Sequence, residues 1–222
     1  MKLISHSFRD NGVIPGRCAF GVQAPKSHVR LADNRNPHLA WIDAPAATKS
    51  FVLICTDPDA PTKPDDVNKE DREVPATLKR GDFIHWVMVD IPPGVTRIAE
   101  GEASQGVTPK GKKKPAGPEG SRQGVNDYTG WFKGDKAMAG TYLGYDGPCP
   151  PWNDSLAHHY RFELFATDLD QCPVDGAFTA ADVRKAIEGH VLARASITGR
   201  YALNPRVQPV STPLNSMRRR RS

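Results

Sequence analysis

Short apolar segments separated by proline and glycine dominate the chain, and most of them have the pattern of β-strands. The 222 residues include 20 prolines and 19 glycines, which divide the sequence into these segments. Residues 50–56 form an apolar, β-branched run that ends at a proline turn, the pattern of a strand buried on both faces. A second strand is predicted over residues 83–91. Its alternation places four side chains on one face: His85, Val87, Val89 and Ile91.

Two further strands and one helix complete the predicted fold. Residues 158–166 alternate so that His158, Tyr160 and Phe162 share a face, and residues 190–203 are predicted as a final strand. Thr179 begins a short helix, because Asp182 follows it at the spacing of an N-terminal cap and an apolar pair comes next. The pattern predicts a mainly β protein with low helix content.

Two stretches interrupt this pattern and are predicted as inserted loops. Residues 62–77 are charged and contain prolines, whereas residues 102–139 are rich in glycine, lysine and proline and carry Tyr128, Trp131 and Phe132. Long loops in compact domains are often functional. We expect one domain over residues 1–205 that includes the 102–139 loop, followed by a flexible basic tail over residues 206–222.

Composition and charge narrow the class of protein. Hydrophobic residues make up 38% and charged residues 25%, typical of a globular chain. The net charge is +5, but residues 218–221 are four arginines, so the remainder is nearly neutral and nucleic-acid binding is not expected. No apolar run is long enough to span a membrane, and the first residues lack the apolar core of a secretion signal, so a cytoplasmic location is expected. The four cysteines are dispersed without a C-x-x-C pair, which disfavours a zinc knuckle or disulfide framework.

Polar groups stand where predicted strands meet turns. Asp57 begins an Asp-Pro-Asp-Ala-Pro motif directly after the first strand, His85 lies in the second, and a Gly-Pro-Cys-Pro-Pro loop at residues 147–151 precedes His158 and Tyr160. Binding groups concentrate at such positions. Each motif alone also has an ordinary structural explanation, as a turn, a core histidine or a rigid loop.

Taken together, these motifs resemble those of a known family. The matching segments are NPHLAW at 36–41, residues 50–61, HWVMVDIP at 85–92, GPCPP at 147–151, residues 158–168 and TGRYALNP at 198–205. In order and approximate spacing they are similar to the phosphatidylethanolamine-binding protein family, in its bacterial and archaeal branch called Raf kinase inhibitor-like. The resemblance covers most of residues 1–205.

The resemblance implies a fold and a site. The expected fold is a large central β-sheet packed against a smaller sheet, with few short helices and a shallow pocket at one end. In the family such a pocket accepts phosphate-like and carboxylate anions, including phospholipid head groups. The implied ligand-binding residues are Asp57, Ala60, Pro61, His85, Gly147, Pro148, Pro150, Pro151, His158 and Tyr160. The resemblance also implies a cis peptide bond between Ala60 and Pro61.

The residue types fit an anion site. Two histidines and a tyrosine can each donate a hydrogen bond, and protonation of a histidine makes its bond charge-assisted. We expect Asp57 to accept from a histidine ring, fixing its tautomer and raising its pKa, so that the second ring nitrogen presents a proton to the ligand.

The sequence predicts a non-catalytic binding protein for a small anion, with no catalytic residue, metal or cofactor. One alternative is an inhibitor of a kinase or peptidase that acts through its surface loops. Another is a metal-dependent hydrolase, because Asp57, His85 and His158 also form a two-histidine, one-carboxylate set. A catalytic serine is disfavoured, since no Gly-x-Ser-x-Gly motif is present.

A homodimer is expected from the resemblance. The aromatic residues of the 102–139 loop would then contribute to the interface or fold back over the rim of the pocket. Alternatively, they pack beneath their own loop.

Overall fold

The computed structural model describes residues 1–207, and its largest element is a six-stranded sheet. The strand order is β2-β11-β10-β6-β7-β9. All neighbouring strands are antiparallel except β2 and β11, which are parallel. The strands are β2 (Gly12–Val13), β6 (Ser50–Pro61), β7 (Arg80–Ile91), β9 (Arg122–Gln123), β10 (His158–Thr167) and β11 (Val191–Tyr201).

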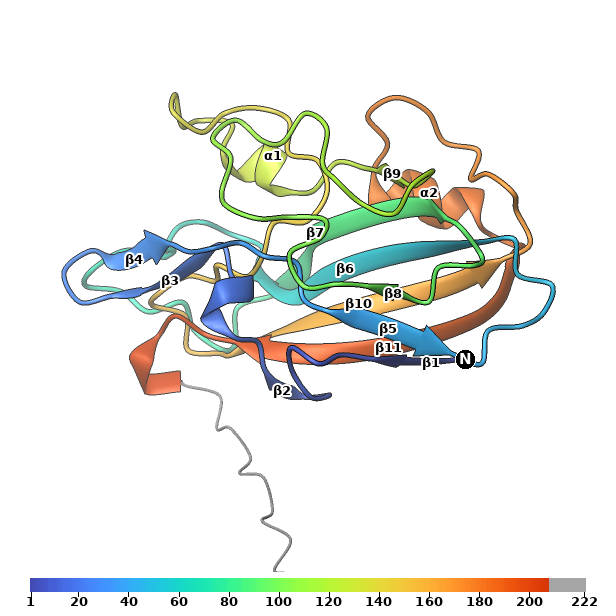
Figure 1. Cartoon of the computed structure of the whole chain (residues 1–222). Coiled ribbons are helices and arrows are strands. Elements are labelled where there is room, and N and C mark those ends of the chain that lie inside the picture. The colour runs from blue at the N-terminus through green and yellow to red at the C-terminus, as the bar shows by residue number, and fades with distance from the viewer. Residues whose placement is uncertain (208–222) are drawn as a thin grey trace, which may run out of the picture.

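A smaller sheet covers one face of the large sheet (Figure 1). It has the order β1-β5-β8, with β1 (Lys2–Ile4), β5 (Leu39–Ile42) and β8 (Arg97–Ile98). Leu39 and Trp41 of β5 pack with Phe51 and Leu53 of β6 in one buried apolar cluster. The family-implied architecture, a large sheet packed against a smaller one, is therefore confirmed.

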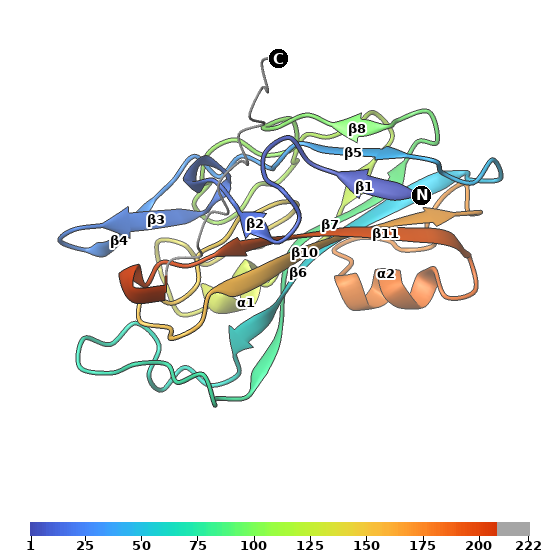
Figure 2. The same ribbon diagram turned by 90° about the horizontal axis from the view of Figure 1, so that it is seen from below.

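Helix α2 (Ala180–Ala186) covers the opposite face of the large sheet, as Figure 2 shows from below. Val183 and Ile187 pack there against Val52 and Ile54 of β6. The helix begins with a reciprocal cap: the Asp182 backbone N–H donates to the Thr179 hydroxyl, and the Thr179 backbone N–H donates to the Asp182 carboxylate. The predicted helix is thus present, with its predicted cap.

The remaining elements are short. A hairpin of β3 (Gly21–Ala24) and β4 (His28–Leu31) extends from one end of the molecule, and the helix α1 (Tyr128–Trp131) lies above that end of the large sheet (Figure 1). The 3-10 turns are η1 (Gly16–Cys18) and η2 (Pro205–Val207). None of the helices within residues 1–207 is long and apolar enough to cross a membrane.

A β-bulge in β7 changes the predicted facing of its side chains. Cys55 pairs with Trp86 but Thr56 pairs with Ile84, so His85 is the extra residue. The bulge turns His85 toward Tyr160, on the face of Trp86, whereas Val87 packs on the opposite face under α2. The prediction that His85, Val87, Val89 and Ile91 share one face is therefore wrong.

The structure also bears on the predicted end of β6, the bond at Ala60–Pro61 and the predicted tail. The strand at residues 50–56 continues to Pro61, where it still pairs with Arg80, and no peptide bond among residues 1–207 is cis. The expected cis bond at Ala60–Pro61 is thus wrong, because the extended, paired backbone of β6 runs through it in the trans form. Of the predicted tail at 206–222, only 206 and 207 are described, and both lie in η2.

The capping contacts of α2 give a stability prediction. Replacing Thr179 with alanine removes the oxygen that accepts from Asp182, so we expect the free energy of unfolding to fall by about 1 kcal/mol. Denaturant titration measures the change. Thr108→Ala, which removes an exposed loop hydroxyl, is the matched control and should have no effect. An equal loss in both variants would contradict the cap.

Candidate functional site

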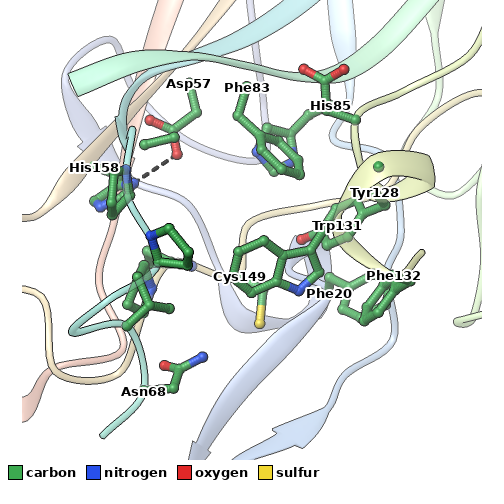
Figure 3. A pocket seen from close by; sticks show the side chains of 18 of the residues that line it. Phe20, Asp57, Asn68, Phe83, His85, Tyr128, Trp131, Phe132, Cys149 and His158 are labelled. Atoms are coloured by element: carbon green, nitrogen blue, oxygen red, sulfur yellow. Dashed lines mark hydrogen bonds and ion pairs between the residues drawn. The ribbon is translucent and has the colours of Figure 1, made fainter. Parts of the chain in front are cut away.

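A cavity of about 780 Å³ opens where β6, β7 and β10 meet the loops at one end of the large sheet. Figure 3 shows Asp57 and His158 on one side of it and His85 and Phe83 on the other. Its lining is mostly apolar or aromatic. The lining residues are Phe20, Leu31, Asp57, Ala60, Pro61, Thr62, Pro64, Val67, Asn68, Phe83, His85, Asp127, Tyr128, Gly130, Trp131, Phe132, Asp135, Met138, Cys149, Pro150, Pro151, His158 and Tyr160.

Eight of the ten predicted site residues line this cavity: Asp57, Ala60, Pro61, His85, Pro150, Pro151, His158 and Tyr160. Gly147 and Pro148 do not line it and instead hold the loop in place. The Gly147 N–H donates to Asn34 and its carbonyl accepts from the Tyr128 hydroxyl. A side chain at Gly147 would collide with the Cys18 carbonyl, which is why this position requires glycine.

His158 lies at the centre of a buried chain of charges. Its Nδ1 is 2.7 Å from Asp57 Oδ2, and its Nε2 is 3.1 Å from Asp154 Oδ2. Arg80 donates to both oxygens of Asp154, at 2.6 and 3.0 Å. The side chains of Asp57, Asp154 and His158 are no more than 4% exposed. The chain therefore contains two negative and two positive groups when His158 is protonated.

These contacts determine the protonation of His158. Burial alone lowers its pKa, but the charge of Asp57 and the hydrogen bonds that the ring donates to both carboxylates raise the pKa to about 9. His158 is therefore an imidazolium at neutral pH. The expectation that Asp57 raises the pKa of a histidine agrees with this geometry. The expectation that the second nitrogen of that ring is presented to a ligand is wrong, because Asp154 accepts from it.

His85 differs from His158 in its hydrogen bonds and in its protonation. Its Nδ1 is 2.7 Å from the Asp146 carbonyl, which can only accept, so Nδ1 carries the proton. Burial lowers the pKa of His85, and the nearby charge of Asp57 offsets this only in part. The ring is therefore neutral at pH 7, and no residue within 1–207 forms a hydrogen bond with its Nε2.

Tyr160 stands beside His85, with their ring centroids 5.0 Å apart. Its hydroxyl is buried and has no hydrogen-bond partner among the described residues. Burial, followed by the negative charge of Asp57, raises the pKa of this phenol, so it remains an O–H donor at neutral pH. A buried donor without a partner needs an explanation, and because Tyr160 lines the cavity, a ligand or an ordered water can accept from its hydroxyl.

Asp146 binds His85 through its backbone carbonyl, and its carboxylate stabilises the loop around that carbonyl. It accepts from Asn34 and Lys112 through Oδ1, both at 2.7 Å, and from Asn126 through Oδ2 at 2.8 Å. Lys112 and Asn126 belong to the 102–139 loop, so this loop helps to fix the tautomer of His85. The sequence gives no indication of this role, because these residues are far apart along the chain and belong to no motif.

The aromatic residues of the 102–139 loop form one wall of the cavity. Tyr128 is 4% exposed and stacks on Phe20, whereas Trp131 is 50% exposed and lies over the cavity (Figure 3). The loop lies over the rim of the pocket, and Tyr128 and Phe132 also pack against Val107 and Met138 of the same loop, so these two alternatives both describe the structure. A homodimer interface stays a prediction.

Asp154 is the main residue that sequence reasoning missed, although its position four residues before His158 places it near the same strand end.

The buried charges predict how stability depends on pH. A histidine pKa raised from 6.5 to about 9 contributes stability that is fully present below pH 6.5 and lost as pH rises through 9. Between about pH 7 and 8 we expect the free energy of unfolding to fall by about 1 kcal/mol. This window lies above the ordinary histidine pKa and below the ordinary cysteine pKa of about 8.5, so the thiols of the unfolded chain stay mostly protonated in it.

Denaturant titration at several pH values measures this change, and His158→Gln should flatten it. His190→Gln is the control, since His190 pairs with Asp168 at the surface, and this variant should keep the slope. A free energy of unfolding that stays constant over this window in both the original chain and His190→Gln would show that His158 is not an imidazolium in the folded state.

Comparisons with known proteins agree with the fold and the motifs. The family model described as phosphatidylethanolamine-binding protein matches residues 4–202. A UPF0098 protein of Methanothermobacter thermautotrophicus is 36% identical over 203 residues, which span 90% of this chain and 98% of the relative. YbhB of Escherichia coli, also a UPF0098 protein, is 33% identical over 202 residues, which span 91% of this chain and 100% of YbhB.

Solved structures give the same result. The crystal structure of Escherichia coli YbcL, described as a new member of the mammalian PEBP family, aligns with a TM-score of 0.64 at 27% identity and covers 90% of this chain and 97% of YbcL. A homologue from Chlamydia trachomatis aligns with a TM-score of 0.61 at 26% identity, covering 90% of this chain and 95% of the homologue. The chain belongs to the phosphatidylethanolamine-binding protein family.

Proposed function

We propose that this protein is a non-catalytic binding protein that recognises a phosphate-like or carboxylate anion in the cavity. The observation that carries the proposal is the buried Tyr160 hydroxyl, which has no hydrogen-bond partner among the described residues and stands beside His85. An anion oxygen supplies the missing acceptor for this hydroxyl. The description of the family names phosphatidylethanolamine, whose head group contains a phosphate, and this supports the same ligand class.

The charges of the site assign different roles to the two histidines. The positive charges of His158 and Arg80 are balanced by Asp57 and Asp154, so this chain of groups has no net charge to offer a ligand. His85 is the group whose protonation can change when an anion binds. A bound anion near Nε2 favours the charged ring and raises its pKa, so binding is accompanied by uptake of a proton at Nε2.

The state of the candidate nucleophiles supports a binding role over catalysis. Burial raises the pKa of the Cys149 thiol to about 12, so this cavity residue is not a thiolate at neutral pH. The Ser155 hydroxyl donates to the Val74 carbonyl and has no histidine partner. The described residues therefore offer neither of these groups in an activated form.

The geometry argues against the two-histidine metal site. As an imidazolium with both nitrogens bonded to carboxylates, His158 has no lone pair for a metal ion. Among residues 1–207, no cluster of three histidine, cysteine or acidic side chains is arranged to hold one. Inhibition of a kinase or peptidase would use the loops around the cavity and stays a prediction.

The two ligand-facing groups can be tested separately. Tyr160→Phe removes only the hydroxyl and should weaken binding of inorganic phosphate by about fivefold, while His85→Ala should weaken it by tenfold or more. Isothermal titration calorimetry measures both. His190→Ala removes a surface histidine as the control and should leave the affinity unchanged. Phosphate affinity equal to that of the original chain in both site variants would refute the proposed site.

Proton uptake by His85 predicts that affinity increases as pH falls. Sulfate is the preferred probe, because its own charge is constant between about pH 5.5 and 7.5. The pKa of His85 is lowered in the free protein, so the ring is neutral at pH 7.5 and becomes easier to protonate toward pH 5.5. His158 stays charged over this range, since its pKa is about 9, and contributes no pH dependence.

Calorimetry in two buffers of different ionisation enthalpy measures the protons taken up. We expect uptake of protons on sulfate binding in the original chain, largest at pH values between the pKa of His85 in the free protein and its pKa in the complex. In His85→Gln, which cannot be protonated, we expect neither the proton uptake nor the pH dependence. Sulfate binding that is independent of pH in the original chain would show that His85 does not respond to the anion.

A further inference from the structure

The large sheet has an open edge along most of β11. On the side away from β10, the two-residue strand β2 pairs with β11 only near its C-terminal end (Figure 2). Next to that pairing, the Thr198 carbonyl accepts from the Asn11 N–H, and the Thr198 N–H donates to the Asp10 carboxylate. Within residues 1–207, no strand pairs with this side of β11 before Thr198. The edge over residues 191–197 is therefore unpaired.

The backbone groups of Arg194 and Ser196 face outward along this edge. Backbone groups of an antiparallel strand alternate between its two sides, and Thr198 faces outward, so Ser196 and Arg194 do so as well. Both residues are exposed, and their backbone N–H and C=O groups have no hydrogen-bond partner among the described residues. An unpaired strand edge of this kind can bind an extended segment of another chain.

Three arginines surround one buried carboxylate on the face of the sheet beside this edge. The Glu163 side chain is 8% exposed, and nitrogens of Arg161, Arg184 and Arg194 lie 3.7, 3.8 and 4.0 Å from its oxygens. These distances are too long for hydrogen bonds. One carboxylate does not balance three guanidinium groups. The Arg161 and Arg194 side chains are more than half exposed, so their N–H groups are accessible to a partner.

A hollow of about 400 Å³ lies between the C-terminal end of α2 and the strands β10 and β11. The three arginines line it, and its other charged groups are Asp82 of β7 and Glu188, which follows α2. The Asp82 carboxylate is 4.0 Å from Arg184 and helps to balance it. The excess positive charge therefore lies on the β11 side of the hollow, at Arg161 and Arg194, next to the open edge.

These charges determine which chain can occupy the edge. Pairing with β11 of a second copy, centred on the open part of the edge, would place two Arg194 side chains at neighbouring positions, and like charges across strands are destabilising. The four arginines at 218–221 of this chain carry the same sign of charge. A strand with acidic side chains instead places a carboxylate beside Arg194 and Arg161. An apolar residue at its end can cover Val191 and Leu192, which are both exposed.

We propose that the open edge of β11 binds an extended, acidic segment of another protein as a seventh strand of the large sheet. The backbone of this segment bonds to Arg194 and Ser196, and an acidic side chain pairs with Arg194 and Arg161. The segment ends where residues 10 and 11 meet Thr198, in line with β2. None of these residues lines the cavity, so this surface is independent of the proposed anion site.

Nuclear magnetic resonance with capped hexapeptides tests the edge. In the probe peptide glutamate and threonine alternate, so that an extended backbone carries its carboxylates on one side. We expect the probe peptide to shift the amide signals of Arg194 and Ser196 and to slow hydrogen exchange at Ser196. A peptide with glutamine in place of glutamate should bind about fivefold more weakly. A probe peptide methylated at all its backbone nitrogens should bind at least tenfold more weakly, because it cannot donate to β11.

Variants of the chain test the same contacts from the other side. Ser196→Pro removes the outward N–H without removing a bond to β10, so it should weaken the probe peptide at least tenfold. Ser196→Ala keeps the N–H and should bind as the original chain does. Arg194→Gln should bind about fivefold more weakly. Arg97→Gln removes an exposed arginine of β8 as the control and should leave the affinity unchanged.

Thermal unfolding shows whether Ser196→Pro is folded. If it is not, the methylated peptide and Arg194→Gln still test the backbone bonds and the charge. Equal binding of the methylated and unmethylated peptides, or no binding of the probe peptide at millimolar concentration, would overturn the proposal. Equal affinity for the glutamate and glutamine peptides would overturn its acidic partner. A Ser196 amide that is protected from hydrogen exchange without any peptide would show that a second copy or another segment of this chain occupies the edge, and would also overturn it.

Discussion

The buried charges around His158 are the constraint on which the rest of the site depends. Placing ionised groups in a protein interior is costly unless each is paired. Here Asp57 of β6 pairs with His158 at the start of β10, and Asp154 links His158 to Arg80 at the start of β7. The chain of ion pairs therefore joins three central strands at the edge of the cavity. Removing any one member leaves this buried chain of groups with an unbalanced charge.

This constraint also decides which groups remain for a ligand. His158 is the most buried histidine of the cavity and carries a charge, yet both of its nitrogens bind carboxylates. His85 lies in a bulge of β7, where the ring turns toward Tyr160 and only one nitrogen is bonded within the described protein. The fixed charge thus stabilises the base of the cavity, while the neutral ring responds to what binds there. A site with two equally free histidines would not separate these roles.

The sequence predicts the elements that local pattern determines. The apolar run of β6, the alternation of β10 and the cap of α2 at Thr179 depend on neighbouring residues, and the structure contains all three. Eight of ten predicted site residues also line one cavity, because the motifs stand at strand ends that the sheet brings together. Gly147 and Pro148 are absent from the lining, since they support the loop from behind.

The missed features all depend on contacts between distant segments. The bulge at His85 arises from its pairing with β6, and alternation within one strand cannot reveal an extra residue. The role of Asp154 is apparent only when β6, β7 and β10 are assembled around it. The trans bond at Ala60–Pro61 likewise follows from pairing with Arg80, which continues β6 further than its apolar run predicts.

The 102–139 loop acts on the cavity at two places. Its Lys112 and Asn126 bind the Asp146 carboxylate, and the Asp146 carbonyl binds His85. Its helix α1 supplies Trp131 to the mouth of the same cavity. The loop therefore contributes to the cavity twice, because it holds the segment whose carbonyl binds His85 and because it forms part of the lining. A change in this loop would reshape the cavity while the strands and their buried charges stay in place.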